Sequence, residues 1–303
     1  MDKSITKILL IKHGAFGDLI QADGIFHDLR LYYANAEIVL LTMSRYKELM
    51  QQSPYIDRVI VDNRVALWHV RDQLKLRQKL RDENIDLVID LQNSNRSSLY
   101  QRYFLPNSPW FSRRSSLNGV SGLQGLKQLL EQHQIPITFA LKPNVSWMAA
   151  NVDELLEKAN VDKPYIALIP GCSAQHPEKR WPYFSKLSAR LVEKGFRVVN
   201  ILGPDELSMA DDLSGYTPSK DKGILSWFEM AGILKHAQYV IGNDTGPSHV
   251  ASCLGTSGIA LFSEHTSVVR SEIQRDSFLT YQVDELKNLS VDTLLSIITP
   301  HLE

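Results

Sequence analysis

The chain has 303 residues, of which 44% are hydrophobic and 22% charged, and its formal net charge at pH 7 is −1. This balance is typical of a globular protein with a large core, and the length favours two domains. A charge near zero excludes a global basic field that would attract nucleic acid. The two cysteines, Cys172 and Cys253, exclude a disulfide framework and fit reduced, buried thiols in a cytoplasmic protein.

The first half of the chain alternates short apolar runs with segments of helical periodicity. The apolar runs predict strands at residues 8–11, 37–41, 58–61 and 87–91, and the periodic segments predict helices at 18–33, 45–50 and 68–81. In the third of these helices we expect Trp68, Leu74 and Leu80 to point inward. Strands that alternate with helices over short connections indicate βαβ units and a parallel sheet.

Residues 107–125 interrupt this alternation, and their Ser, Gly, Asn and Arg content predicts a loop. Helical patterns follow at 123–134 and 145–159, with prolines between them. We therefore divide the chain into domains at 1–150 and 151–303, with the last helix free to pack back toward the first domain.

The second half repeats the pattern. Strands are expected at 165–169, 197–202, 239–241 and 259–262, and helices from Pro182, at 205–213, at 227–235, and after a capping Ser290. The sequence thus predicts two Rossmann-like, doubly wound α/β domains. Ligands of such sheets bind at the carboxyl ends of the strands, and a central cleft between two such domains is the expected site.

The first motif, at residues 12–18, follows the first strand. It has two glycines in a G-x-x-G spacing, and Thr42 stands where a dinucleotide-binding protein has an acid, which argues against a dehydrogenase. Asp18 lies at the start of a helix. It either caps that helix or acts as a general base toward a substrate hydroxyl.

The second motif, at residues 171–182, places Lys179 and Arg180 just before a helix. Cations oppose the dipole at a helix N-terminus, so their position favours a bound anion, although a solvated basic loop is the alternative. Ser173 and the amides of residues 171–173 could add contacts to phosphate.

The third motif, at residues 242–249, joins a strand to a helix. Gly242 and Gly246 permit a sharp turn, and the amides at the helix entrance form an anion site, unless the segment is simply a capped turn. Together with the second motif it predicts a cradle for a diphosphate. No carboxylate cluster has metal-ligand spacing, so we expect no required metal and no cofactor.

These three motifs, together with Asp90-Leu91-Gln92 followed by Arg96-Ser97, stand in the order found in one family. The sequence resembles glycosyltransferase family 9, which includes the ADP-heptose:lipopolysaccharide heptosyltransferases. The resemblance implies a GT-B fold with an acceptor-binding N-terminal half and a nucleotide-sugar-binding C-terminal half.

The resemblance also implies roles for individual residues. Asp18 would deprotonate the acceptor hydroxyl, and Lys179 would neutralise the leaving diphosphate. The resemblance and the second and third motifs together give the expected donor-binding residues, which are Gly171, Ser173, Arg180, Glu206, Asp244, Thr245, Gly246, Pro247 and His249. The expected acceptor-binding residues are Gly14, Gly17, Gln92, Arg96, Arg113 and Arg114. Asp23 is a second carboxylate near the G-D pair and competes with Asp18 for the role of base.

The resulting hypothesis is an inverting, metal-independent transfer of heptose from ADP-heptose to an anionic lipopolysaccharide-core acceptor. A nucleotide-sugar epimerase of the same fold and a nucleotide-sugar-binding protein without catalysis are the alternatives.

The lipid acceptor suggests peripheral contact with the cytoplasmic face of the inner membrane. Such contact would suit the aromatic residues Phe104, Trp110 and Phe111 beside Arg102, Arg113 and Arg114. A second basic run comprises Lys75, Arg77, Lys79 and Arg81. It is most simply a solvated helix face, with contact to anionic lipid as the alternative.

Overall fold

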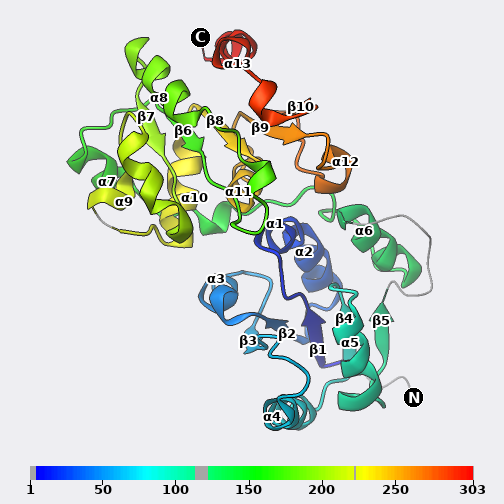
Figure 1. The fold of residues 1–303 in the computed structure, drawn as a ribbon. Helices are drawn as coiled ribbons and strands as arrows, with labels where there is room; N and C mark the ends of the chain where they lie inside the picture. Colours follow the sequence, from blue (N-terminus) through cyan, green and yellow to red (C-terminus); the bar gives the residue numbers. More distant parts are fainter. Residues whose placement is uncertain (1–4, 113–121, 222, 303) are drawn as a thin grey trace. The chain divides into compact units, whose positions relative to one another are not determined.

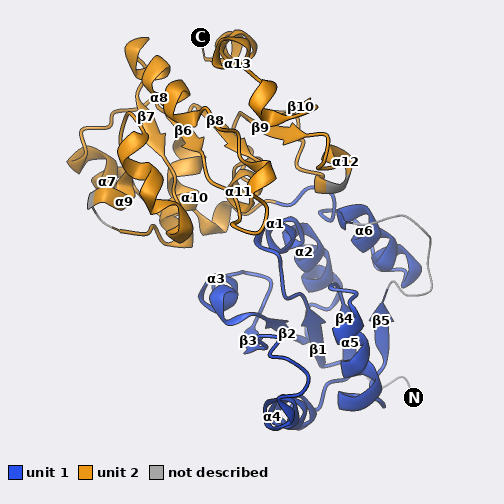
Figure 2. Ribbon diagram, viewed as in Figure 1, with its two compact units in different colours: residues 1–143 blue, residues 144–303 orange. Residues whose placement is uncertain are grey.

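The computed structural model describes residues 5–112, 122–221 and 223–302. The chain divides into two compact units, Met1–Pro143 and Asn144–Glu303 (Figure 2). The division falls slightly before the boundary between 150 and 151 that we placed from the sequence. Among the described residues, no helix is long and apolar enough to cross a membrane.

Unit 1 is built on a five-stranded parallel sheet with the order β3-β2-β1-β4-β5 (Figure 1). Its strands are β1 (Lys7–Ile11), β2 (Glu37–Thr42), β3 (Arg58–Val61), β4 (Leu87–Asp90) and β5 (Trp110–Ser112). Its α-helices are α1 (Phe16–Gln21), α2 (Asp23–Tyr32), α3 (Lys47–Gln51), α4 (Val70–Asp82), α5 (Asn95–Leu99) and α6 (Gly122–Gln132), and a π-helical turn, η2, covers Tyr100–Phe104. The central strand β1 is buried on both faces, as expected of a parallel strand covered by helices.

Unit 2 has a second five-stranded parallel sheet, with the order β10-β9-β8-β6-β7. Its strands are β6 (Ile166–Ile169), β7 (Val198–Asn200), β8 (Tyr239–Asn243), β9 (Gly258–Ser263) and β10 (Phe278–Val283). Its α-helices are α7 (Asp153–Lys158), α8 (Phe184–Glu193), α9 (Pro218–Asp221), α10 (Trp227–His236), α11 (Gly246–Cys253), α12 (Val268–Ser271) and α13 (Val291–Ile298). The 3₁₀ turns relevant to the site are η5 (Pro177–Lys179) and η6 (Pro204–Asp212).

The closing helix α13 belongs to the core of unit 2. Its residues Leu294 and Ile298 are fully buried and share a cluster with Leu187 of α8 and with Ile166 of β6. Ser290 caps α13 by accepting the Thr293 N–H at 3.0 Å, as the sequence predicted.

Each sheet has one point at which the strand order reverses. In unit 1 this point lies between β1 and β4, and in unit 2 it lies between β6 and β8. The chain leaving these strands at their carboxyl ends diverges to opposite faces of the sheet and opens a crevice, where ligands of doubly wound sheets bind. The predicted class, two Rossmann-like doubly wound α/β domains, is confirmed.

Several local predictions were wrong. Residues 107–125 contain β5, and β10 was missed, because both strands lie at sheet edges and are only partly buried, so their apolar signal is weak. The segment 18–33 forms two helices that meet at Ala22. Residues 145–159 are helical only at 146–148 and 153–158. Pro182 precedes its helix, which begins at Phe184, and 205–213 is mostly 3₁₀.

The orientation of α4 also differs from the prediction. Leu80 is fully buried and Leu76 packs on the core, but Leu74 is 52% exposed and Trp68 is 81% exposed. At 100° per residue Leu74 lies opposite Leu76, so both cannot face the sheet. Trp68 precedes the helix and belongs to the loop after β3.

Candidate active site

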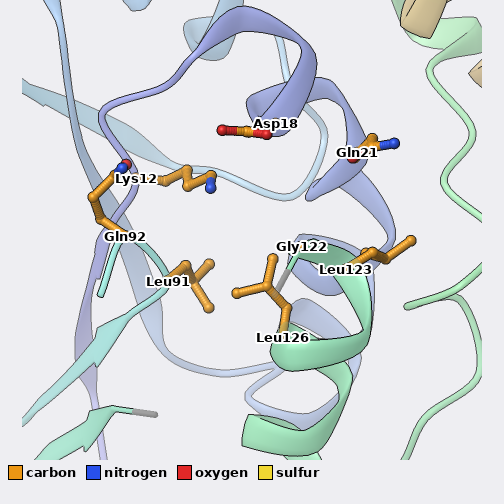
Figure 3. Close-up of a pocket in the computed structure, with 8 residues that line it drawn as sticks. All are labelled: Lys12, Asp18, Gln21, Leu91, Gln92, Gly122, Leu123 and Leu126. Carbon is orange, nitrogen blue, oxygen red and sulfur yellow. The ribbon is translucent and has the colours of Figure 1, made fainter. Parts of the chain in front are cut away.

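A cavity of about 140 Å³ lies at the carboxyl edge of the unit 1 sheet, next to the point of reversal between β1 and β4. Figure 3 shows its lining, which comprises Lys12, Asp18, Gln21, Leu91, Gln92, Gly122, Leu123 and Leu126. Two predicted site residues, Asp18 and Gln92, therefore meet at one cavity. Lys12 was not among the predicted site residues, although its place directly after β1 is a signal for one.

Asp18 is the third residue of α1 and is exposed. Its Oδ2 accepts the Ala15 N–H at 3.2 Å, so Asp18 caps its own helix, which is one of the two roles predicted for it from the sequence. The same carboxylate lines the cavity, and Figure 3 shows the Lys12 side chain extending toward the space beneath it. Capping and facing a ligand are thus compatible in this residue. Asp23, by contrast, is 3% exposed and is not part of the cavity lining.

Gln92 joins the ends of β1 and β4. Its Oε1 accepts the His13 N–H at 2.8 Å. Asp90 shapes the turn that carries it, because Asp90 Oδ1 accepts the N–H groups of Gln92 at 3.0 Å and Asn93 at 2.8 Å. The amide of Gln92 thereby fixes the loop that leads from β1 to Asp18.

The side chain of His13 anchors the loop that leads from β1 to Asp18. Its Nε2 lies 2.8 Å from Asp62 Oδ2, and both residues are buried. Burial opposes ionisation of Asp62, yet hydrogen bonds from His13 and Tyr100 outweigh it and keep the pKa of Asp62 below its ordinary value. A charged, buried anchor therefore holds the start of the Gly14–Asp18 loop.

Several predicted acceptor residues have other roles in the structure. Gly14 has φ +130°, and a Cβ there would lie 2.9 Å from Tyr46 Cε2, so this glycine serves the turn. Neither Gly14 nor Gly17 lines the cavity.

Arg96 is likewise outside the lining of the cavity, and its guanidinium donates to Val65 O at 2.8 Å and to the Tyr100 hydroxyl. Arg113 and Arg114 lie outside the described residues.

The expected membrane-contact aromatics are also used internally. Phe104 is 8% exposed and belongs to the core of unit 1. Phe111 stacks on His133 with ring centroids 3.5 Å apart, and Trp110 Nε1 donates to Leu105 O at 3.2 Å. This group of residues therefore does not form the exposed aromatic surface that we predicted.

In unit 2, the predicted catalytic residue Lys179 and the predicted donor-binding residues Asp244 and His249 form one polar cluster. Lys179 Nζ donates to Asp244 Oδ2 at 2.5 Å, and His249 Nε2 lies 3.7 Å from Asp244 Oδ1. Burial of Asp244 opposes its ionisation, but the proximity of His249 and the hydrogen bond from Lys179 prevail and hold its pKa below the ordinary value. Asp244 thus fixes the positions of two groups that can carry positive charge.

The cluster surrounds the N-terminus of α11. Thr245 is the N-cap residue, but its side chain makes no capping bond. Within the described residues, two buried polar atoms here have no hydrogen-bond partner, Thr245 Oγ1 and His249 Nδ1, and Arg180 Nε in the loop before α8 has none either. Buried polar groups are normally paired, so orphaned groups at a helix entrance are the features expected where a polar ligand binds.

Asn243 places the second motif next to the third. Its amide donates to Pro170 O at 3.0 Å and Gly171 O at 2.9 Å, and its Oδ1 accepts the Trp181 N–H at 3.0 Å. A Cβ at Gly242 would lie 2.5 Å from Ser248 Oγ, so glycine is required at this strand end. These bonds fix the loop after β6 against the end of β8.

Glu206 closes the other side of the loop after β6. Its carboxylate accepts the Gly203 N–H at 2.7 Å and lies against Gly171, where a Cβ would come within 1.8 Å of it. Burial raises the pKa of Glu206. Ser173 is exposed, and its hydroxyl accepts the Gln175 N–H at 3.3 Å.

Two units, each with a doubly wound parallel sheet and polar side chains at its point of reversal, place this chain in the class of two-domain α/β proteins that bind ligands at strand ends. The sequence profile of Glycosyltransferase family 9 (heptosyltransferase) matches residues 126–277. Because this range covers half of the chain and all of the unit 2 cluster, the chain belongs to that family and is a glycosyltransferase.

Relatives agree with this assignment. Lipooligosaccharide heptosyltransferase 2 of Haemophilus influenzae is 22% identical, with 84% of this chain and 82% of that protein aligned. Lipopolysaccharide heptosyltransferase 3 of Escherichia coli is 24% identical, with 81% and 79% aligned.

Solved structures share the fold. A family 9 glycosyl transferase from Veillonella parvula has a TM-score of 0.80 at 16% identity and covers 100% of this chain and 98% of its own. The E. coli ADP-heptose lps heptosyltransferase II has a TM-score of 0.76 at 17% identity, with 98% of each chain covered. These likenesses confirm the GT-B class of fold.

Proposed function

We propose that this protein transfers heptose from ADP-heptose to an anionic acceptor of the lipopolysaccharide core, with inversion at the anomeric carbon and without a metal. The names of its relatives support the sugar and the acceptor class. In this proposal unit 2 binds the donor and unit 1 binds the acceptor. Catalysis would take place in the cytoplasm, where nucleotide sugars serve as donors.

The observation that carries the proposal is the Lys179–Asp244–His249 cluster at the entrance of α11. The departing diphosphate gains negative charge in the transition state, and preorganised cations and helix-terminal amides stabilise such charge. Lys179, Arg180 and the amides of the first turn of α11 can supply this stabilisation. A carboxylate repels phosphate, so Asp244 acts here by positioning Lys179 and His249.

On the acceptor side, Asp18 is the proposed general base. It lies exposed at the cavity, whereas the competing Asp23 is buried, and a base must come within about 3 Å of the hydroxyl that it deprotonates. Lys12 lines the same cavity and provides a cation for a carboxylate or phosphate of the acceptor. Gln92 would contribute a polar contact beside it.

The expected stereochemical outcome, inversion, follows from the placement of the base and of the groups that stabilise the leaving diphosphate on opposite faces of the sugar. Glycosyl transfer passes through an oxocarbenium-like state. If the acceptor oxygen, activated by Asp18, attacks from one face while the diphosphate leaves from the other, the anomeric centre inverts in one step. In this scheme Lys179 and Arg180 of unit 2 stabilise the charge of the leaving diphosphate, which a metal ion does in metal-dependent transferases.

The test is calorimetry with ADP, UDP and GDP, each with and without EDTA, followed by turnover of ADP-heptose. We expect ADP to bind best and EDTA to have no effect. Asp18→Asn should leave ADP binding intact and reduce turnover by at least about a hundredfold. Preference for UDP or GDP would contradict the heptose donor, and equal turnover by the Asp18→Asn protein would contradict the base. Sugar-nucleotide conversion without acceptor would instead indicate an epimerase.

A further inference from the structure

The loop after β3 and the first turns of α4 expose an unusually apolar surface. Trp68 is 81% exposed, Val70 61%, Leu74 52% and Leu67 50%. Val70 and Leu74 are four residues apart and share one side of α4. Large apolar side chains gathered at one place on a surface mark an interaction site.

The same segment is rich in positive charge. Residues 64–82 contain six Lys or Arg and two Asp, although the whole chain has a net charge of −1. Arg71, Lys75 and Lys79 are exposed at four-residue spacing and form a stripe next to Val70 and Leu74. Within the described part of the chain, none of these three cations pairs with a carboxylate. We call these residues, together with Leu67 and Trp68, the α4 patch.

The α4 patch stands on a rigid base. Leu80 is buried under α4, and Arg81 Nε donates to Phe104 O at 2.9 Å. The preceding loop is held by Gln73, which donates to Val65 O at 3.2 Å, and by Arg96, which donates to the same carbonyl at 2.8 Å. The exposed side chains are therefore presented by an ordered loop and helix.

The α4 patch begins at the same edge of the unit 1 sheet as the cavity. The loop leaves β3 at its carboxyl end, and all strands of this sheet are parallel, so β1 and β4 end at that edge as well. Arg96, which holds Val65, follows Gln92 of the cavity by four residues. Leu67 and Trp68, in that loop, consequently lie toward the edge from which the cavity is lined, whereas α4 runs back along the sheet to reach the start of β4.

We propose that the α4 patch docks the protein onto an anionic lipid bilayer. Trp68 and Leu67 would enter the boundary between headgroups and acyl chains, and Arg71, Lys75 and Lys79 would contact the headgroups. Basic helices with adjacent Trp and Leu bind interfaces in this way, and each cation near the surface strengthens binding about fivefold. The proposal rests on the proposed function to the extent that a glycolipid acceptor would then be presented at the edge that contains the cavity.

The test uses the full chain and vesicles of phosphatidylcholine with or without phosphatidylglycerol. We expect flotation with the anionic vesicles only, weakened by salt, and a blue shift of tryptophan emission that Trp68→Phe abolishes. Leu67→Ser/Trp68→Ser and Lys75→Glu/Lys79→Glu should each reduce vesicle affinity by at least about tenfold.

Matched controls come from unit 2. Val269→Ser removes an apolar side chain that is 84% exposed, and Lys186→Glu/Lys194→Glu reverses two exposed charges, one on α8 and one at its C-cap. Both control proteins should bind vesicles as the unaltered protein does.

Three results would overturn the proposal. The first is that the wild-type protein does not bind anionic vesicles. The second is that the α4-patch variants bind these vesicles as well as the wild-type protein does. The third is that the protein is a dimer, which Trp68→Ser dissociates without any change in flotation. ADP calorimetry on the same variants separates this proposal from the proposed function. The variants should bind ADP normally, and failure of ADP binding in the wild-type protein would refute the donor site while leaving the membrane result unaffected.

Discussion

Lys179 has two partners in the proposed cycle, Asp244 in the free protein and the diphosphate during transfer. Its side chain is 25% exposed, and that of Asp244 is 9% exposed, so the ion pair lies at the rim of the site, where a ligand can reach it. The carboxylate keeps the ammonium in place before the donor arrives. The positive charge of Lys179 is thus preorganised to stabilise the leaving diphosphate.

We expect Lys179→Ala to lower kcat by about a hundred- to a thousandfold, the usual effect of removing one group that stabilises a developing anion. Initial rates with ADP-heptose measure this, and circular dichroism checks the fold. Lys194→Ala, an exposed lysine of the same unit, is the control and should keep full activity. A Lys179→Ala protein with normal kcat would remove this residue from the mechanism.

Asp244 also predicts a pH dependence of stability. Its pKa in the folded state is below its ordinary value, so the ionised carboxylate stabilises the fold above about pH 4, and this contribution is lost as pH falls through the folded-state pKa. Asp244→Asn should therefore destabilise the protein at neutral pH, by about 1–3 kcal/mol, and by less in acid.

Urea unfolding from neutral pH to about pH 3 measures the difference between the two proteins. Asp276→Asn, at an exposed aspartate in unit 2, should show no such pH-dependent difference. A constant offset between Asp244→Asn and the unaltered protein at every pH would contradict the assignment.

At the scale of elements, the donor site depends on close contact between the loop after β6 and η6. Glu206 of η6 occupies the space where a side chain at Gly171 would lie, with 1.8 Å between its Cδ and the ideal Cβ. The strands themselves contribute backbone positions, and Asn243 at the end of β8 ties the loop to them.

Gly171→Ala should accordingly displace Glu206, destabilise the protein by about 1–3 kcal/mol and weaken ADP binding. Glu206→Ala removes the obstacle, so the double variant Gly171→Ala/Glu206→Ala should be more stable than the sum of the two single effects predicts. Thermal unfolding and calorimetry of the four proteins test the coupling, and simple additivity would disprove the contact.

At the scale of the molecule, the two units are proposed to divide donor and acceptor between them. Each unit has its own reversal of strand order and its own polar site. ADP without acceptor should therefore protect backbone amides from hydrogen exchange at 171–180 and 242–249, and leave 12–18 unchanged. Saturation to about 100 Kd should stabilise the fold by about 2.7 kcal/mol. Protection confined to residues 12–18 would reverse the assignment of the units.

The sequence alone determined the architecture and the donor motifs. Buried parallel strands such as β1 and β6 are continuous apolar runs, and Gly246 and Pro247 mark the start of α11, three residues after β8 ends at Asn243. These signals are local, so they can be read without knowledge of the partners. The family resemblance through Asp18, Lys179 and residues 243–249 depends on the same local motifs.

The tertiary structure decided which side chains meet. Lys12 lines the cavity, and Arg96 binds Val65 and Tyr100, because contacts between residues far apart in the sequence set their surroundings. Trp68 is exposed and Phe104 is buried, contrary to expectation, because Trp68 lies in the loop before α4 and Phe104 packs in the core of unit 1. Periodicity identifies a helix, whereas only packing selects the face that it buries.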